Sequence, residues 1–430
     1  MLEHIGRYIF KKRIFYGWWI VAAGCVSMAM SSGLFFTGFG FFFEPIRNYF
    51  GWNRTILSGA YAISRIESSF TGPLIGYLIQ RFGPRTVMIV SFVIFGTGFI
   101  LIGRSVSVFT FYIAFIVTAT GADPPGFLAI MASINNWFKV NRAKAMGIAM
   151  LGLGIGGVVF PPLLAFGLNN FSWREVSTAS GIFIIVVGIF VSMLVRFNPE
   201  SYGYLPDGIN PNDTENLSSV NANSSGPNST KAVAPNVEGV GLQDAIKTRA
   251  FWIISIGHGQ ALLVVSVAGL YQVPYLEDSL GFSRNSAAGI VMLLTAVNMF
   301  GQLFGGFLAD RLQKNLMASA TIVGHCLALI ILAIADSYGL VIVYAVIQGL
   351  SWGVRSPVLT SMRGDYFGRK SFPLILGTSQ GIAMLGMVIG PMFVGYVADH
   401  YSYSLGFTII SFMAMPGIFL FLFMKKPALN

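Results

Sequence analysis

"GYLIQRFGPR" at residues 76–85 and "GGFLADRLQK" at residues 305–314 are two versions of one pattern. A constant offset of 230 residues relates them, since Gly76 corresponds to Gly306 and Arg81 to Arg311. The same offset recurs elsewhere, relating Gly147 to Gly377, Gly156 to Gly386 and Pro161 to Pro391. The chain is therefore predicted to consist of two related halves in parallel orientation.

Around these stretches the chain is strongly apolar. It is 54% hydrophobic and only 10% charged, with a mean hydropathy of +0.70, whereas soluble domains carry about a quarter charged residues. Runs of roughly 20 apolar residues, enough to cross a ~30 Å hydrocarbon core as a helix, occur near residues 16–40, 56–79, 86–103, 107–133, 145–168, 176–195, 250–273, 286–309, 316–335, 339–361, 374–397 and 403–424. The sequence predicts an all-α membrane protein with twelve transmembrane helices, because a barrel shows alternating segments of about 10 residues instead.

The net charge of +10 follows from topology rather than from nucleic-acid binding. With the N terminus inside, 20 of the 27 Lys and Arg residues fall on the inner side and 5 on the outer side. This asymmetry predicts that both termini are cytoplasmic and that the protein lies in the plasma (inner) membrane. Cys25 and Cys326 lie in apolar runs and are read as packing residues, without a disulfide or a metal site.

Residues 201–241 are rich in Asn, Ser, Pro and Gly and follow the sixth apolar run. Such a composition is typical of a mobile linker. The predicted organisation is an N-terminal six-helix bundle over residues 1–200, a cytoplasmic linker over 201–241 and a C-terminal six-helix bundle over 242–430. The two bundles are expected to be pseudo-symmetric.

The two opening stretches resemble the G-x-x-x-D-R-x-G-R motif of the major facilitator superfamily, and the resemblance covers essentially the whole chain. It implies the major facilitator fold and a gate in which charge contacts hold the cytoplasmic helix ends together. The residues that match this gating motif are Gly76, Arg81, Gly83, Arg85, Asp310 and Arg311. Gln80 stands where the first copy normally has Asp, which puts the strength of the N-half gate in doubt, and Gln313 stands where the second copy normally has Gly.

A narrower resemblance is to the branch of monocarboxylate transporters and oxalate/formate antiporters. The stretches that carry it are "FYGWWIV" (15–21), "RFNPESYGYLPDG" (196–208), "TRAFW" (248–252), "QVPYLEDSLGFS" (272–283) and "DYFGRK" (365–370). The branch implies transport of small organic acid anions, commonly with a proton or in exchange for a counter-substrate. Its members usually carry an Arg on helix 8, eight residues before the motif Asp, where this chain has Gln302.

Arg65 and Glu67 lie inside the second apolar run, where a charge costs about 2.5–3.5 kcal/mol or more. Residues two apart are separated by about 200° around a helix and do not face each other. At least one of them is therefore expected to point to the central cavity or to another helix. The alternatives are an interhelical ion pair, or Arg65 as an anion-binding group and Glu67 as a proton carrier.

Arg355 lies in the tenth apolar run, and its planar guanidinium can grip a carboxylate through two bonds. We interpret it as the anchor that replaces the missing helix 8 Arg, the alternative being a side chain that extends toward the cytoplasmic end of its helix. Gln302, Asn298 and Tyr271 are expected to add hydrogen bonds to the substrate.

Asp123 precedes Pro124 and Pro125, which interrupt the fourth helix and free backbone carbonyls. It is either a proton or cation site or the partner of Arg65. His258 titrates near neutral pH when unperturbed, so it is either a coupling site or a hydrogen-bonded packing residue.

The sequence contains no phosphate-binding loop and no H-E-x-x-H motif, and its four His are scattered. We therefore expect no enzyme activity, no cofactor and no metal, so that uphill transport must draw on a gradient. The prediction is a secondary active transporter of a small organic anion, a monocarboxylate, working by alternating access. Its partners are a small-molecule substrate, protons or a counter-substrate, and the lipid bilayer, and it is expected to be a monomer. The alternatives are an exporter of amphiphilic or cationic compounds and a transport-inactive membrane sensor or scaffold.

Overall fold

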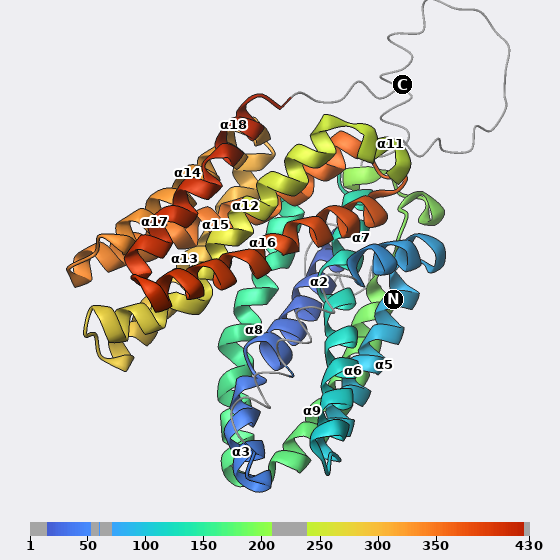
Figure 1. The fold of residues 1–430 in the computed structure, drawn as a ribbon. Coiled ribbons are helices and arrows are strands. Elements are labelled where there is room, and N and C mark those ends of the chain that lie inside the picture. The colour runs from blue at the N-terminus through green and yellow to red at the C-terminus, as the bar shows by residue number, and fades with distance from the viewer. Residues whose placement is uncertain (1–14, 53–59, 61–70, 209–238, 425–430) are drawn as a thin grey trace, which may run out of the picture.

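A computed structural model describes residues 15–52, 60, 71–208 and 239–424 (Figure 1). The N half contains α2 (Gly17–Met30), a π-helical turn (Ser31–Phe36), α3 (Gly40–Phe50), a helix over residues 71–82, α5 (Pro84–Gly103), α6 (Val108–Gly126), α7 (Leu128–Trp137), α8 (Arg142–Asn170) and α9 (Trp173–Leu194). Two short 3-10 helices follow, η2 (Glu200–Tyr202) and η3 (Pro206–Gly208).

The C half is built in the same way. It contains α11 (Leu242–Lys247), α12 (Arg249–Pro274), η4 (Tyr275–Ser279), α13 (Arg284–Ala309), α14 (Lys314–Ala333), α15 (Tyr338–Phe367), α16 (Phe372–His400), α17 (Tyr403–Ala414) and α18 (Pro416–Leu422).

Within the described residues, ten helices are long and apolar enough to cross a membrane. The predicted span over 107–133 is divided into α6 and α7 at Phe127, whose φ of −126° and ψ of −63° are not helical. The break follows the predicted interruption at Pro124 and Pro125, because proline removes a backbone donor and crowds the preceding turn. The predicted span over 56–79 lies mostly outside the described residues, with its last part in the helix over 71–82. The prediction of an all-α membrane fold is confirmed.

Serine residues begin four helices on the face remote from the linker. The Oγ atoms of these serines accept the backbone N–H three residues later at 3.2 to 3.3 Å. Such caps satisfy first-turn donors that have no partner within the helix. The capping residues are Ser107 for α6, Ser172 for α9, Ser283 for α13 and Ser402 for α17.

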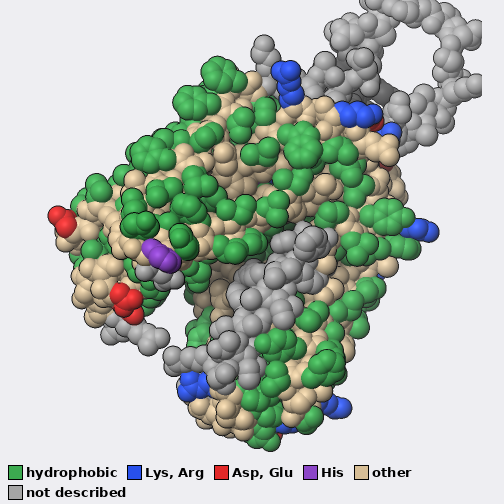
Figure 2. Space-filling model, viewed as in Figure 1, with side chains coloured by type: hydrophobic (Ala, Val, Ile, Leu, Met, Phe, Trp, Pro, Cys, Tyr) green, Lys and Arg blue, Asp and Glu red, His purple; other side chains and the backbone are tan. Residues whose placement is uncertain are grey.

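Each half has its own apolar core. In the N half the core is rich in stacked and edge-on phenylalanines, including Phe35, Phe39, Phe99 and Phe115. In the C half, α13 packs along α15 and α12 packs along α16. Figure 1 shows the two bundles meeting beside α7 and α11 and diverging toward the opposite end, and Figure 2 shows a hollow between them there.

Two backbone crossings join the halves, and they are equivalent by the offset of 230. A Cβ on Gly76 would lie 2.5 Å from the carbonyl oxygen of Pro373 at the start of α16, and a Cβ on Gly306 would lie 2.7 Å from that of Ala143 at the start of α8. Further along the same helices, Gly147 faces the Gln302 carbonyl, and Gly377 faces the Gly72 carbonyl. Glycine allows this approach because its backbone carries no side chain to keep the helices apart. The sequence repeat is therefore a pseudo-two-fold relation in space.

Candidate functional site

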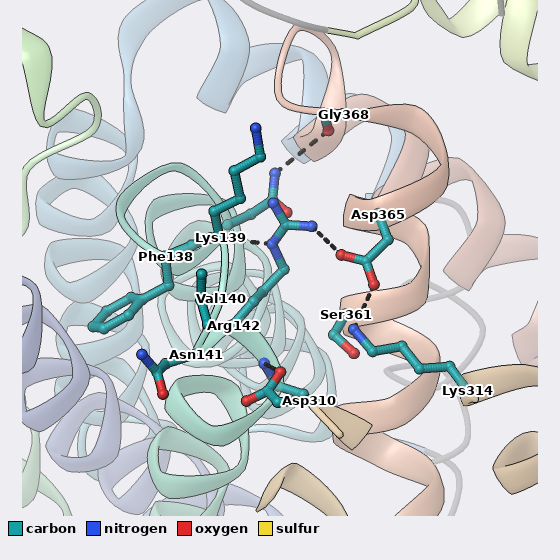
Figure 3. Close-up of polar contacts among 12 residues, drawn as sticks. Phe138, Lys139, Val140, Asn141, Arg142, Asp310, Lys314, Ser361, Asp365 and Gly368 are labelled. Carbon is teal, nitrogen blue, oxygen red and sulfur yellow. Dashed lines mark hydrogen bonds and ion pairs between the residues drawn. The ribbon is translucent and has the colours of Figure 1, made fainter. Parts of the chain in front are cut away.

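The start of α8 is held by carboxylates of the C half (Figure 3). Asp310, which follows α13, accepts the backbone N–H of Ala143 at 3.0 Å and that of Lys144 at 2.9 Å. These N–H groups belong to the first helical turn, where donors lack partners and the helix dipole favours negative charge. Arg142 Nη1 lies 2.5 Å from Asp365 Oδ1, and Lys314 pairs with the other oxygen of Asp365. This face of the molecule is therefore closed by a charged gate.

Burial raises the pKa of the Asp310 carboxyl above its ordinary value, while its bonds to the N–H groups of Lys144 and Ala143 oppose the rise. The carboxylate is therefore held as an acceptor in a place that water does not stabilise well. It depends on α8 for its partners, and α8 depends on it for its cap.

The remaining residues of the gating motif divide into two groups. Gly76 lies at a backbone crossing, and Gly83 begins α5 at a φ of +80°, which favours glycine. Arg81, Arg85 and Arg311 are exposed on the face that carries the linker, and Arg81 Nη1 donates to the Tyr77 hydroxyl at 2.9 Å.

The N half supplies neutral amides at the equivalent positions. Gln80 corresponds to Asp310, and its Nε2 donates to the Oγ of Ser371, the residue before α16, at 3.3 Å. Asn135 corresponds to Asp365, and its Nδ2 donates to the Gly368 carbonyl at 3.4 Å. The departure at Gln80 predicted a weaker N-half contact, whereas Asn135 was missed, although the offset of 230 from Asp365 points to it.

One ion pair crosses from the segment after α9 to the loop between α15 and α16. Arg369 donates through Nη1 and Nη2 to the two carboxylate oxygens of Glu200, at 2.7 and 3.0 Å. Burial opposes ionisation of Glu200, but the hydrogen bonds from Arg369, a backbone hydrogen bond and the charge of Arg369 together outweigh it and leave the pKa of Glu200 below its ordinary value. Both residues line a cavity of about 840 Å³ on this face, together with Arg142, Asp310 and Asp365.

Arg355 lies inside the C half. Its side chain is 2% exposed, and its Nε and Nη1 have no hydrogen-bond partner among the described residues. Gln348 Oε1 meets His325 Nδ1 of α14 at 2.9 Å, and Arg355 lies seven residues further along α15, on the same face. Arg355 therefore lies on the face of α15 that meets α14.

Arg363 is the second buried guanidinium of α15, and sequence reasoning assigned it only to the inner-side charge count. It donates to Ser379 Oγ at 2.9 Å and to the Leu359 carbonyl at 3.1 Å, and its Nη2 meets His258 Nδ1 at 3.0 Å. Because a guanidinium only donates, Nδ1 of His258 is the acceptor and the imidazole is neutral in this arrangement. The sequence signal for Arg363 was its position on the same apolar helix as Arg355, eight residues further along.

The other predicted substrate residues are placed apart from Arg355. Gln302 Nε2 donates to Asn298 Oδ1 at 3.0 Å, and both side chains are buried on α13. Gly353 packs against the backbone of this pair, so the pair lies against a different face of α15 from that of Arg355. Tyr271 donates to the Pro391 carbonyl at 2.9 Å, near the remote end of α12.

Three predicted residues lie beyond what the structure describes. Arg65 and Glu67 fall outside the described residues, and for Asp123 only the backbone, within α6, is described. Their roles stay predictions.

Comparison with known proteins gives the family. The sequence model described as Major Facilitator Superfamily matches residues 25–315 and 254–430. The chain is 24% identical over 423 residues to monocarboxylate transporter 2 of Mesocricetus auratus, covering 95% of this chain and 84% of that protein. It is 24% identical over 391 residues to monocarboxylate transporter 13 of Rattus norvegicus, covering 89% and 83%.

Two solved structures share the fold. The human organic anion transporter MFSD10 (TETRAN) superposes with a TM-score of 0.71 at 13% identity, covering 94% of this chain and 99% of that one. The proton:xylose symporter XylE, bound to 6-bromo-6-deoxy-D-glucose, gives 0.71 at 14% identity and 96% coverage of both chains. The chain belongs to the Major Facilitator Superfamily, and it is a multi-pass membrane transporter that resembles the monocarboxylate transporters.

Proposed function

We propose that the protein is a secondary active transporter of a small organic anion, a monocarboxylate, whose carboxylate is anchored by Arg355. The observation that carries this proposal is a buried guanidinium with two donors, Nε and Nη1, that have no hydrogen-bond partner in the part of the chain that the structure describes. A buried charge without a partner is strongly unfavourable. A carboxylate offers both the opposite charge and two acceptors that match the guanidinium fork.

The charges of the C half favour an anion over a cation. Among the described residues neither Arg355 nor Arg363 forms an ion pair. The described acidic residues of the C half lie at helix ends or in loops, at Asp244, Glu277, Asp278, Asp310, Asp336, Asp365 and Asp399. The names of the relatives, monocarboxylate transporters, agree with an anionic substrate.

The transport cycle is alternating access. The halves are closed on the face with the linker and diverge on the other, so the substrate enters from the remote face in this conformation. Arg355 is covered here, and Pro357, two residues further, marks the point where α15 can bend to uncover it. The charge asymmetry of the loops supports a cytoplasmic linker and cytoplasmic termini in the plasma membrane.

Coupling is to protons or to a counter-substrate. Glu67, Asp123 and His258 are the proton-coupling candidates, and Arg65 is the candidate for a second substrate contact. Gln302, Asn298 and Tyr271 lie apart from Arg355 in this conformation, so they could contact the substrate only at another stage of the cycle. We propose that the protein works as a monomer with functional halves at residues 1–200 and 242–430.

A panel of ligands tests the substrate class. The detergent-purified protein is heated with small carboxylates such as formate, acetate and lactate, and separately with amphiphilic cations. We expect a carboxylate to raise the melting temperature, Arg355→Gln to abolish the rise and Arg104→Gln, which removes an exposed arginine on the remote face, to retain it. Stabilisation by cations alone would overturn the proposal in favour of the exporter alternative.

A further inference from the structure

Asp207 makes an unusual set of contacts at the start of the linker. Its Oδ2 accepts the backbone N–H of Lys139 and that of Val140, each at 2.7 Å, and its Oδ1 accepts that of Asn141 at 3.1 Å. All three donors belong to the loop between α7 and α8. Among the described non-glycine residues only Asp207 has a positive φ, at +59°, a conformation that Asn and Asp tolerate better than most.

The N–H groups at the start of α8 are thus shared between two carboxylates. Asp207 takes residues 139–141, and Asp310 takes the N–H groups of Ala143 and Lys144. In the sequence, Arg142 lies between these two groups of N–H donors, and its side chain forms an ion pair with Asp365. Asp207, in the part of the linker that directly follows the N half, accepts from N-half donors, whereas Asp310 and Asp365 belong to the C half. Separation of the halves therefore breaks the contacts of Asp310 and Asp365 with α8 but not those of Asp207.

We propose that Asp207 is a positioning residue of the transport cycle, which holds the start of α8 in the arrangement that Asp310 and Asp365 must meet for the linker side to close. Without this carboxylate, closure must also order the loop over residues 138–141, and an interaction that needs ordering is weaker than one that is preorganised. Loss of Asp207 therefore favours the conformation open on the linker side.

The other described end of the linker, at residues 239–240, contacts the equivalent loop of the C half. Val240 N–H donates to the Phe367 carbonyl at 3.1 Å, and Gly239 pairs with Gly368 in an isolated β-bridge. The loops before α8 and before α16 are related by the offset of 230. Both ends of the segment that joins the halves therefore lie against the two loops that form the gate.

Opening is measured with a single cysteine at Ala143, whose side chain is buried against the C-half core, in full-length protein that lacks Cys25 and Cys326. The rate of maleimide labelling in detergent reports exposure of this position. We expect Asp207→Asn to raise the rate about five-fold. Asp244→Asn, which removes an exposed carboxylate of α11 on the same face, is the matched control and should leave it unchanged.

A backbone-compatible variant and a double-mutant cycle separate the role of the carboxylate from that of the unusual backbone conformation. Asp207→Gly removes the carboxylate but adopts a positive φ freely, so it should also label about five-fold faster than the parent. A double-mutant cycle of Asp207→Asn with Asp310→Asn should be non-additive, because both act on one gate. Parent-like labelling in Asp207→Gly, equal acceleration in Asp244→Asn or strict additivity in the cycle overturns the proposal. The labelling needs no substrate, so its outcome is separate from that of the carboxylate panel.

Discussion

At the scale of a residue, Gln80 tests how unequally the two halves close the gate. It makes one hydrogen bond of 3.3 Å to Ser371, where its counterpart Asp310 caps a helix with a charge. In Gln80→Asp the new carboxylate faces the start of α16, and charges at helix N-termini contribute about 0.3–1 kcal/mol. We expect labelling of a cysteine at Ala143 to slow by about threefold. Gln243→Asp, which adds the same charge at an exposed site of α11, should have no effect, and an equal response of both variants would show that net charge alone is responsible.

Asp310 gives the gate a pH dependence whose sign follows from burial. Its pKa is raised in the closed conformation, so closure binds its proton more tightly than an exposed state does, and falling pH favours closure. The pKa of Glu200 is lowered, so its ion pair is lost only below the ordinary value of about 4.3. We expect the labelling rate of Asp310→Asn relative to the parent to rise as the pH falls from about 7 toward the ordinary Asp value of about 3.9. Because the same thiol titrates in both proteins, its ionisation cancels in the ratio of the two labelling rates. A ratio that does not change with pH would contradict the prediction.

At the scale of an element, α15 tests whether its contact with α13 depends on glycine. A Cβ on Gly353 would lie 2.2 Å from the carbonyl oxygen of Asn298 and 2.7 Å from the Cα of Gly301. Overpacking of this kind costs about 1–3 kcal/mol. Gly353→Ala should therefore lower the melting temperature of the purified protein. Gly339→Ala on the same helix, where a Cβ meets nothing within 4 Å, should be neutral or slightly stabilising, and equal melting of the two variants would contradict close packing at Gly353.

The elements were more predictable than their contacts. The run predicted over 286–309 is the observed span Ser286–Ala309, because continuous apolar sequence of the right length has few alternatives to a membrane helix. The divided helix at Phe127 was signalled by two prolines. Of the predicted linker the structure describes only the two ends, which are held through Asp207 and Val240, and its composition gave no sign of these partners more than 60 residues away.

At the scale of the whole molecule, the repeat predicts the fold well and the site only in part. The offset of 230 reappears as the paired crossings at Gly76 and Gly306. Asp310 was predicted because a local motif carries it. The pairing of Arg363 with His258 joins segments 105 residues apart, and such contacts are set by packing rather than by local pattern.

The two halves are also joined by the ion pair of Glu200 and Arg369, which a charge reversal tests. Its side chains are 25% and 18% exposed and share two hydrogen bonds, so the pair should contribute more than the ~0.2–1 kcal/mol of a fully exposed pair. Glu200→Arg places two positive charges together across the interface, and we expect faster labelling of a cysteine at Ala143. Adding Arg369→Glu restores an opposite pair and should return the rate toward that of the parent. Asp244→Arg reverses a charge within α11 without crossing the halves and serves as the control. Recovery in the double variant would show that this contact between the halves, and not the charge of either surface, holds the linker side closed; failure to recover would limit the gate to Arg142, Asp310 and Asp365.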